Sequence, residues 1–295
     1  PVDGERILTY RHALDLRVCP QKLLIIGAGA IGIEFAYFYS SFGADVTVVE
    51  VLENILPIED QDVSKGLERN FTKAGIKIKT KTMVESLTRK GQNISAILKT
   101  SEKVEEWNGD YCLVAVGFQG NVENIGLEAL GIKTDKGKIV VDANQQTNVP
   151  GIYAIGDCTP GQALAHVASK EAIICVEAIA HNEKKYHHKP EALDYNNVPG
   201  CTYCSPEIAS VGYTEKQARD AGYEVKVGKF PLSASGKASA AGHMEGFVKV
   251  IFDAKYGEWL GTHMIGYNVT EMIAETVVGR KLETTYHEVL NSIHP

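Results

Sequence analysis

The sequence has no uninterrupted apolar run that could cross a membrane. Its longest one, Leu23 to Ile33, is broken by three glycines, is stopped by Glu34, and is far shorter than the roughly 20 residues of a membrane helix. No basic start followed by an apolar segment marks a targeting sequence. Positive charge is also scarce, because 30 Lys and Arg face 37 Asp and Glu, a net charge of −7. We therefore expect neither a membrane span nor a nucleic-acid partner.

Cysteine is sparse as well, with six residues scattered over a chain of 295. This excludes a disulfide scaffold and favours a reducing compartment, for which we expect the cytoplasm. Cys201 and Cys204 form a C-x-x-C pair, but it lies in a strand-like segment, where residues three apart point to opposite faces. A second pair that could complete a zinc site is missing from the sequence. We interpret both cysteines as structural and expect no metal.

The first half of the sequence alternates buried strands with amphipathic helices. The strands are predicted at 22–27, 44–50, 76–80 and 111–117, and the helices at 30–42 and 61–75. Residues 83–99 predict a hairpin inserted between them. This order is typical of an α/β, doubly wound domain that carries a β insertion.

The second half has a different pattern. Two short strands are expected within 138–157, followed by a helix over 163–180 and a polar linker over 181–200. After the linker come several strands and helices beginning at Thr214 and Val269. Capping-box pairs are predicted at Thr214 with Gln217 and at Thr285 with Glu288. We expect this part to form an α+β domain.

A glycine-rich turn follows the first long strand. Gly27, Gly29 and Gly32 have the G-x-G-x-x-G spacing, and Glu50 ends the next strand 18 residues after Gly32. The three glycines suit a tight turn, the approach of a pyrophosphate to the helix N-terminus, and close helix–strand packing. An acid at Glu50 would bind ribose hydroxyls and repel a 2′-phosphate, which favours NAD over NADP. The same fingerprint also serves the adenosine half of FAD, and a turn without a ligand is the remaining alternative.

Several motifs occur in an order that resembles one family. They are GAGAIGIE (27–34), VTVVE (46–50), LVAVGFQGN (113–121), YAIGDC (153–158) with LAHVASKEA (164–172), PEIASVGYTE (206–215), EWLGTHMIG (258–266) and the terminal HP. Together they resemble the flavin disulfide reductases, most closely the dihydrolipoyl dehydrogenase branch, over essentially the whole chain. The resemblance implies an NAD-binding domain at 1–127, a central FAD-contacting segment at 128–195 and a truncated dimerisation domain at 196–295.

The resemblance also implies roles for single residues. Most NAD contacts would come from the glycine turn and the start of the helix after it, and from the acid that ends the next strand. Val84 would contact the adenine, and the backbone at Gly117 would approach the cofactor closely. The full set is Gly27, Ala28, Gly29, Ala30, Ile31, Gly32, Glu34, Glu50, Val84 and Gly117. Asp157 and the backbone of Ala165 would contact FAD. His294 would be the catalytic base. The family carries an arginine where this sequence has Phe118, so that polar contact is not expected here.

The activity implied is oxidation of protein-bound dihydrolipoamide, with electrons passing through a redox disulfide and FAD to NAD. The implied partners are a second copy of the chain and the lipoyl-bearing domain of a 2-oxo-acid dehydrogenase or glycine-cleavage complex. The FAD-binding domain, the redox cysteines and the glutamate partner of His294 would lie outside this sequence. We therefore expect a fragment that is inactive alone. The alternatives are a mercuric- or glutathione-type reductase, and a non-catalytic NAD-binding or dimerisation module.

Overall fold

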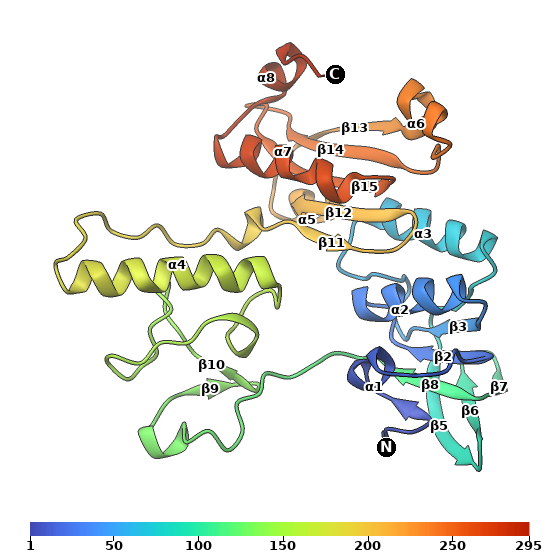
Figure 1. Cartoon of the computed structure of the whole chain (residues 1–295). Coiled ribbons are helices and arrows are strands. Elements are labelled where there is room, and N and C mark those ends of the chain that lie inside the picture. The colour runs from blue at the N-terminus through green and yellow to red at the C-terminus, as the bar shows by residue number, and fades with distance from the viewer. Residues whose placement is uncertain (295) are drawn as a thin grey trace. The chain divides into compact units, whose positions relative to one another are not determined.

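The computed structural model describes residues 1–294, so Pro295 of the terminal motif lies outside the described residues. The chain divides into two compact units. The first combines Pro1–Gly117 with the chain from Pro199 onward, and the second is Phe118–Val198. Figure 1 labels the elements of both. The boundaries predicted after residues 127 and 195 stay predictions.

A five-stranded parallel sheet forms the first part of unit 1. Its order is β1-β8-β2-β3-β4, with strands β1 (Ile7–Leu8), β2 (Lys22–Ile26), β3 (Asp45–Val49), β4 (Lys77–Lys79) and β8 (Tyr111–Val114). Helices α2 (Ala30–Ser41) and α3 (Gln61–Lys73) follow β2 and β3. The doubly wound α/β prediction is confirmed. Strand β1 and helix α1 (Tyr10–Leu14), at the start of the chain, were not predicted.

The β insertion covers one face of this sheet. It is a three-stranded antiparallel sheet of β5 (Met83–Lys90), β6 (Asn93–Lys99) and β7 (Val104–Gly109), so the predicted hairpin gains a third strand. Ile94, Leu98 and Trp107 from the insertion share a core with Leu24 and Val49 of the parallel sheet. The opposite face of the parallel sheet packs on α2 and α3.

The second sheet of unit 1 is antiparallel, with the order β11-β12-β15-β14-β13. Its strands are β11 (Gly200–Thr202), β12 (Glu207–Gly212), β13 (Val225–Pro231), β14 (Phe247–Asp253) and β15 (Trp259–Gly266). The accompanying helices are α5 (Glu215–Asp220), α6 (Gly236–Ala241), α7 (Val269–Lys281) and α8 (Tyr286–Asn291). Both predicted capping boxes are present, at α5 and α8, and the α+β prediction is confirmed.

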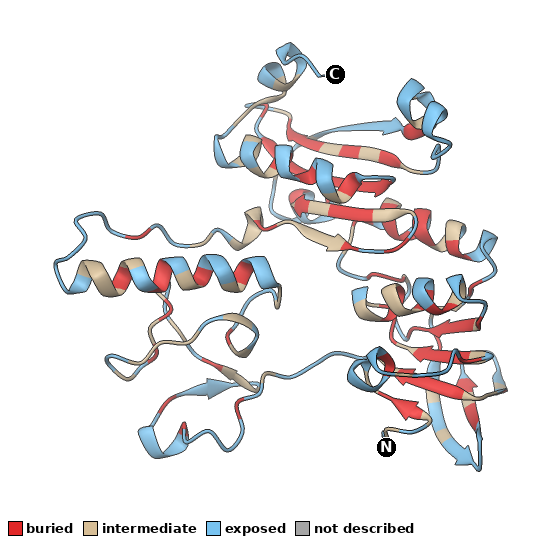
Figure 2. Cartoon of the chain, in the orientation of Figure 1, coloured by how far each residue is buried: buried red, intermediate tan, exposed pale blue. Residues whose placement is uncertain are grey.

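Helix α3 packs against both sheets of unit 1. Its Leu67 and Phe71 share one core with Ile208 and Ile265 of the antiparallel sheet, and Figure 2 shows the buried residues of α3 in red. A side chain at Gly66 would begin 3.4 Å from the Cδ1 atom of Ile265, so the helix lies close to the strand there. Continuous apolar packing thus joins the parallel sheet to the antiparallel sheet.

Unit 2 has its own small core, built from residues including Val122, Ile132 and Ile139. Its elements are η1 (Glu128–Leu130), β9 (Thr134–Asp135), β10 (Lys138–Ile139), η2 (Gly156–Cys158), α4 (Ala165–Asn182) and η3 (Tyr195–Asn197). The predicted helix over 163–180 corresponds to α4. Throughout residues 1–294, each helix is either too short or too polar to cross a bilayer.

Candidate functional site

The glycine turn between β2 and α2 is held by close backbone approaches. Gly27 has a φ of +102°, and a Cβ atom there would lie 2.4 Å from the carbonyl oxygen of Ala115. A Cβ atom at Gly32 would lie 2.0 Å from the carbonyl oxygen of Gly27. Neither position can hold a side chain unless the backbone moves. The glycines are therefore required by the tight turn and by helix–strand packing, as the spacing predicts.

Gly29 differs from its two neighbours in the motif. Its φ is −72°, which any residue can adopt, and a Cβ atom built on it would meet nothing within 4 Å. Gly29 is the N-cap of α2, and no side chain caps that helix start. Unpaired N–H groups at a helix N-terminus attract phosphate. The fold itself does not need glycine here, but an approaching dinucleotide diphosphate would, so these residues fit NAD.

Glu50 is bound to this turn by its carboxylate. Its Oε2 atom accepts a hydrogen bond from the Ala28 N–H at 2.8 Å, and its Oε1 atom accepts one from the Leu52 N–H at 2.9 Å. The residue is only 8% exposed, so the acid is fixed where β3 meets the turn. Each carboxylate oxygen has a second lone pair that could accept a ribose hydroxyl.

The other residues predicted to contact NAD differ in how exposed they are. Ala28 is buried, and Ala30 and Ile31 form the first turn of α2. Gly117 has a φ of +124°, with nothing within 4 Å of the Cβ position. Val84 packs against the core shared by the insertion and the parallel sheet, whereas the side chain of Met83 beside it is exposed. The contact of Val84 with the adenine stays a prediction.

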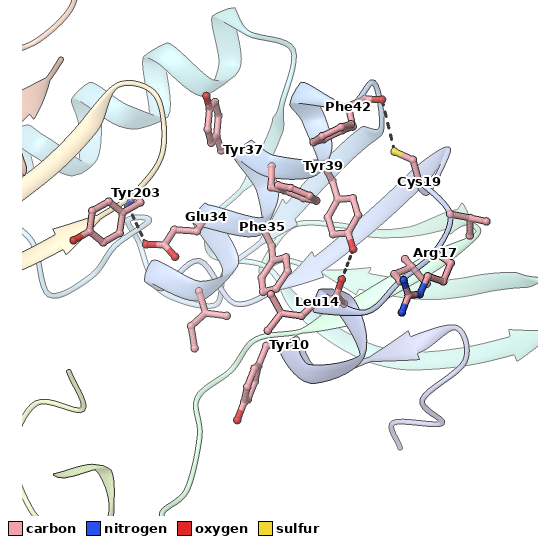
Figure 3. A pocket seen from close by; sticks show the side chains of 15 residues that line it. Tyr10, Leu14, Arg17, Cys19, Glu34, Phe35, Tyr37, Tyr39, Phe42 and Tyr203 are labelled. Carbon is pink, nitrogen blue, oxygen red and sulfur yellow. Dashed lines mark hydrogen bonds between the residues drawn. The ribbon is translucent and has the colours of Figure 1, made fainter. Parts of the chain in front are cut away.

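An aromatic pocket of about 640 Å³ lies beside α2 and includes residues of α1 in its lining. Figure 3 shows Glu34 at this pocket, with Tyr203 donating its backbone N–H to the Glu34 Oε1 atom at 2.9 Å. Burial raises the pKa of Glu34, although this hydrogen bond opposes the shift. Sequence reasoning missed the pocket, because part of its lining comes from residues 10–19, for which no element was predicted.

The predicted FAD contacts lie in unit 2. Asp157 lies in η2 with an exposed side chain, and Ala165 is the exposed first residue of α4, a helix without a side-chain cap. Phe118, which stands where the family carries arginine, has the Lys138 ammonium 5.3 Å from its ring centroid. A positive charge therefore lies close to that position even though arginine is missing.

His294 follows α8 and has a carboxylate partner within this chain. Its Nε2 atom lies 2.7 Å from Oε1 of Glu275 on α7, and its Nδ1 atom lies 3.2 Å from the Ser292 carbonyl oxygen. Both ring nitrogens face acceptors, an arrangement that suits the doubly protonated ring. The hydrogen bond and charge of Glu275 raise the pKa of His294. No sequence pattern pointed to Glu275, because the two residues are 19 positions apart.

Replacing Glu275 with glutamine should lower the pKa of His294 toward its ordinary value, because the ring loses its negative partner. A raised pKa in the folded state stabilises the fold below the unfolded-state pKa, and this contribution is lost as pH rises through the folded-state pKa. The variant should therefore lose this pH-dependent contribution. An NMR titration of the His294 ring measures the change. Glu271→Gln, one turn earlier on α7, is the control and should leave the titration unchanged. An identical titration in Glu275→Gln would contradict the pairing.

The two cysteines of the C-x-x-C pair do not have the properties of reactive thiols. Cys201 and Cys204 are free thiols, and burial raises the pKa of both. A thiol with a raised pKa is a poor nucleophile at neutral pH. Over residues 1–294, no group of three or more His, Cys, Asp or Glu side chains is placed to hold a metal ion.

Comparison with known proteins agrees with this geometry. Residues 1–172 match the pyridine nucleotide-disulphide oxidoreductase family, and residues 198–295 match its dimerisation domain. The dihydrolipoyl dehydrogenase of Rhizobium etli is 48% identical over 294 residues, which are 99% of this chain and 60% of that protein. The Zymomonas mobilis enzyme of the same name is also 48% identical, over 99% of this chain and 62% of that protein.

Solved structures give the same result. LpdA from Mycobacterium tuberculosis superposes with a TM-score of 0.88 at 29% identity, over 99% of this chain and 62% of that one. The HOCl-induced flavoprotein disulfide reductase RclA from Escherichia coli, solved as a Cu(II) complex, has a TM-score of 0.90 at 26% identity, over 100% of this chain and 64% of that one. The chain thus spans about three fifths of its relatives' length. By these matches, the chain belongs to the pyridine nucleotide-disulphide oxidoreductase family.

Proposed function

We propose that this chain forms the NAD-binding, central and dimerisation parts of a dihydrolipoyl dehydrogenase, which oxidises protein-bound dihydrolipoamide and reduces NAD. The observation that carries the proposal is the glycine turn with Glu50 bound to it. It lies in a chain 48% identical throughout to the Rhizobium etli enzyme of that name. A fold alone would not support a function, but a matching site within it does.

The cofactors that suit this family are FAD and NAD. Bound FAD supplies a two-electron acceptor between the substrate thiols and NAD. For NAD, the open backbone at Gly29 and the first turn of α2 would bind the diphosphate, and Glu50 would orient the ribose. Asp157 and the backbone of Ala165 would contact FAD through their exposed polar groups.

His294 would act as the base that takes a proton from a dihydrolipoamide thiol, since the thiolate is the reactive form. The Glu275 carboxylate would stabilise the imidazolium that results. The match to a dimerisation domain supports a homodimer, in which His294 would serve the disulfide of the partner copy. We further propose a lipoyl-bearing domain of a 2-oxo-acid dehydrogenase or glycine-cleavage complex as the substrate carrier. For the location we propose the cytoplasm, which the scattered cysteines support.

The decisive experiment is an assay of NADH formation from dihydrolipoamide and NAD, using the flavin-loaded protein that contains this chain. His294→Gln should slow turnover by at least about 100-fold while leaving NAD affinity intact, because only proton transfer is lost. Turnover of glutathione or mercuric ion in place of lipoamide would instead identify another reductase. NAD binding without any flavin would identify a non-catalytic module.

Glu50→Arg should weaken NADH binding by about ten- to a hundredfold, because the ribose loses its acceptor and two backbone N–H groups lose theirs. NADPH binding should improve, since arginine attracts the 2′-phosphate. Calorimetry with both cofactors measures this change. Glu53→Arg, an exposed acid in the same loop paired with Lys81, is the charge-matched control. Unchanged NADH affinity in Glu50→Arg would contradict the ribose assignment.

A further inference from the structure

A buried acid in unit 2 has no role in the function proposed so far. Glu171 on α4 is only 1% exposed. Its Oε2 atom accepts the backbone N–H of Gly156 at 2.7 Å, and its Oε1 atom accepts the hydroxyl of Tyr195 at 2.6 Å. A buried carboxylate is costly unless donors satisfy it, and here both oxygens have one. This acid therefore links three separate segments: η2, α4 and η3.

Tyr195 is fitted closely to this position. A Cβ atom at Gly161 would lie 2.7 Å from the Tyr195 Cε1 atom, so the ring occupies space that only glycine leaves open. Gly161 also has a φ of +115°, which favours glycine for a second reason. Burial, together with the hydrogen bond and charge of Glu171, raises the pKa of Tyr195 to about 12. The phenol thus remains a hydrogen-bond donor at any physiological pH.

The turn that Glu171 holds carries Asp157. Thr159 donates to the Gly156 carbonyl oxygen through its N–H at 2.8 Å and through its hydroxyl at 2.7 Å. Lys138 donates its ammonium to the Asp157 carbonyl oxygen at 2.9 Å. Among residues 1–294, in contrast, the exposed Asp157 carboxylate has no hydrogen-bond partner. The backbone is thus held on both sides of Asp157, while its exposed side chain is left to meet a ligand.

We propose that Glu171 and Tyr195 are positioning residues for flavin: they fix the η2 turn so that Asp157 presents its carboxylate to the hydroxyl-bearing part of FAD. The inference rests on the proposed function, since it takes FAD as the ligand of Asp157. A carboxylate held in place before binding loses less conformational entropy when a polyol hydroxyl donates to it. Glu171 touches the turn and not the ligand, so its effect on flavin is indirect.

The first test measures FAD affinity in the full flavoprotein that contains this chain, by removing and re-adding flavin and following its fluorescence and visible spectrum. Glu171→Ala should weaken FAD binding by about tenfold, and Tyr195→Phe by about threefold. Glu171→Gln keeps an acceptor for the Gly156 N–H and should restore affinity to within about twofold of wild type. Glu177→Ala, on the same helix but without a bond to the turn, is the matched control.

The second test follows amide hydrogen exchange at Gly156 in this chain itself, without flavin. Exchange should quicken in Glu171→Ala and Tyr195→Phe but not in Glu177→Ala. If Glu171→Ala fails to fold, Tyr195→Phe decides, because it removes a single hydroxyl. Wild-type FAD affinity in Tyr195→Phe, together with unchanged Gly156 exchange in the same variant, would overturn the inference. So would lowered thermal stability without lowered affinity. A wild-type flavoprotein that binds no FAD would instead overturn the proposed function, whatever the exchange at Gly156 shows.

Discussion

Replacing Lys249 with methionine is expected to lower the free energy of unfolding by about 3 kcal/mol at neutral pH. Lys249 is only 3% exposed, and its ammonium lies 2.9 Å from Asp60, 3.1 Å from Asp62 and 3.0 Å from Glu215. Methionine keeps the length and apolar stem of lysine but removes the charge. It leaves the equally buried Asp60 without a counter-ion, and removing one member of a buried ionic group costs far more than the group contributes net.

The loss should depend on pH in a definite direction. Burial opposes ionisation of Asp62, but Lys249 outweighs it and holds the pKa of that carboxyl below its usual value. Arg219 and Lys249 lower the pKa of Glu215 in the same way. A lowered pKa stabilises the fold above the unfolded-state value and stops doing so as pH falls through the folded-state value. The difference between wild type and Lys249→Met should therefore shrink as the pH falls below about 4.

Urea unfolding at neutral and acidic pH measures both effects. The control is Lys229→Met, because Lys229 is the cross-strand partner of Lys249 and lies 3.4 Å from the same Asp62, yet is well exposed. Its loss should stay below about 1 kcal/mol, as for other surface ion pairs. Equal losses in the two variants, or a loss in Lys249→Met that does not change with pH, would show that burial of the charge cluster does not determine its contribution to the free energy of unfolding.

This cluster also bears on how unit 1 is assembled. Asp60 caps α3, the helix after β3 of the parallel sheet, whereas Lys249 and Glu215 belong to β14 and α5 of the antiparallel part. Apolar contacts of α3 allow many similar packings, but an ammonium among three carboxylates has one geometry that satisfies it. We expect the cluster to set the angle between the two sheets.

Local patterns explain why much of the fold could be predicted. The run from Leu23 to Ile26 is apolar on both faces, as a central parallel strand requires, and glycines then mark the turn. Thr214 and Thr285 cap helices through residues three positions away, so their signal lies within one turn. The glycine spacing likewise encodes contacts that the structure shows at Gly27 and Gly32.

The rest depended on contacts that no local pattern carries. Lys249 and Asp60 are 189 positions apart in the sequence. A lysine in a strand with alternating polarity predicts an exposed side chain, because nothing nearby in the sequence indicates the acids that surround it in the fold. Glu171 reads as an ordinary acid of a helix face, because its donors come from Gly156 and from Tyr195, 24 positions later. Glu275 is 19 positions from His294 and lies on a neighbouring helix, so no local pattern could indicate that pairing. The glutamate that the resemblance places beyond His294 stays a prediction.

Gly29→Ala is expected to separate ligand binding from folding at the glycine turn. Its backbone angles suit alanine, and the new methyl group meets nothing within 4 Å, so the free energy of unfolding should hardly change. NAD affinity should nevertheless fall by about ten- to a hundredfold, because the methyl occupies the approach of the diphosphate. Gly32→Ala should, in contrast, lower the free energy of unfolding. Its methyl would lie 2.0 Å from the Gly27 carbonyl oxygen, so it should destabilise the protein with or without cofactor.

Calorimetry with NADH and thermal unfolding of both variants test this contrast. Gly236→Ala serves as the control, since it also places a methyl in open space but at α6, away from the turn, and should change neither quantity appreciably. Normal NADH affinity in Gly29→Ala would mean that no diphosphate lies against the start of α2. The open space at Gly29 would then need another explanation, and the two N–H groups bound by Glu50 would mark that acid as a support of the turn and not as a ligand of the ribose.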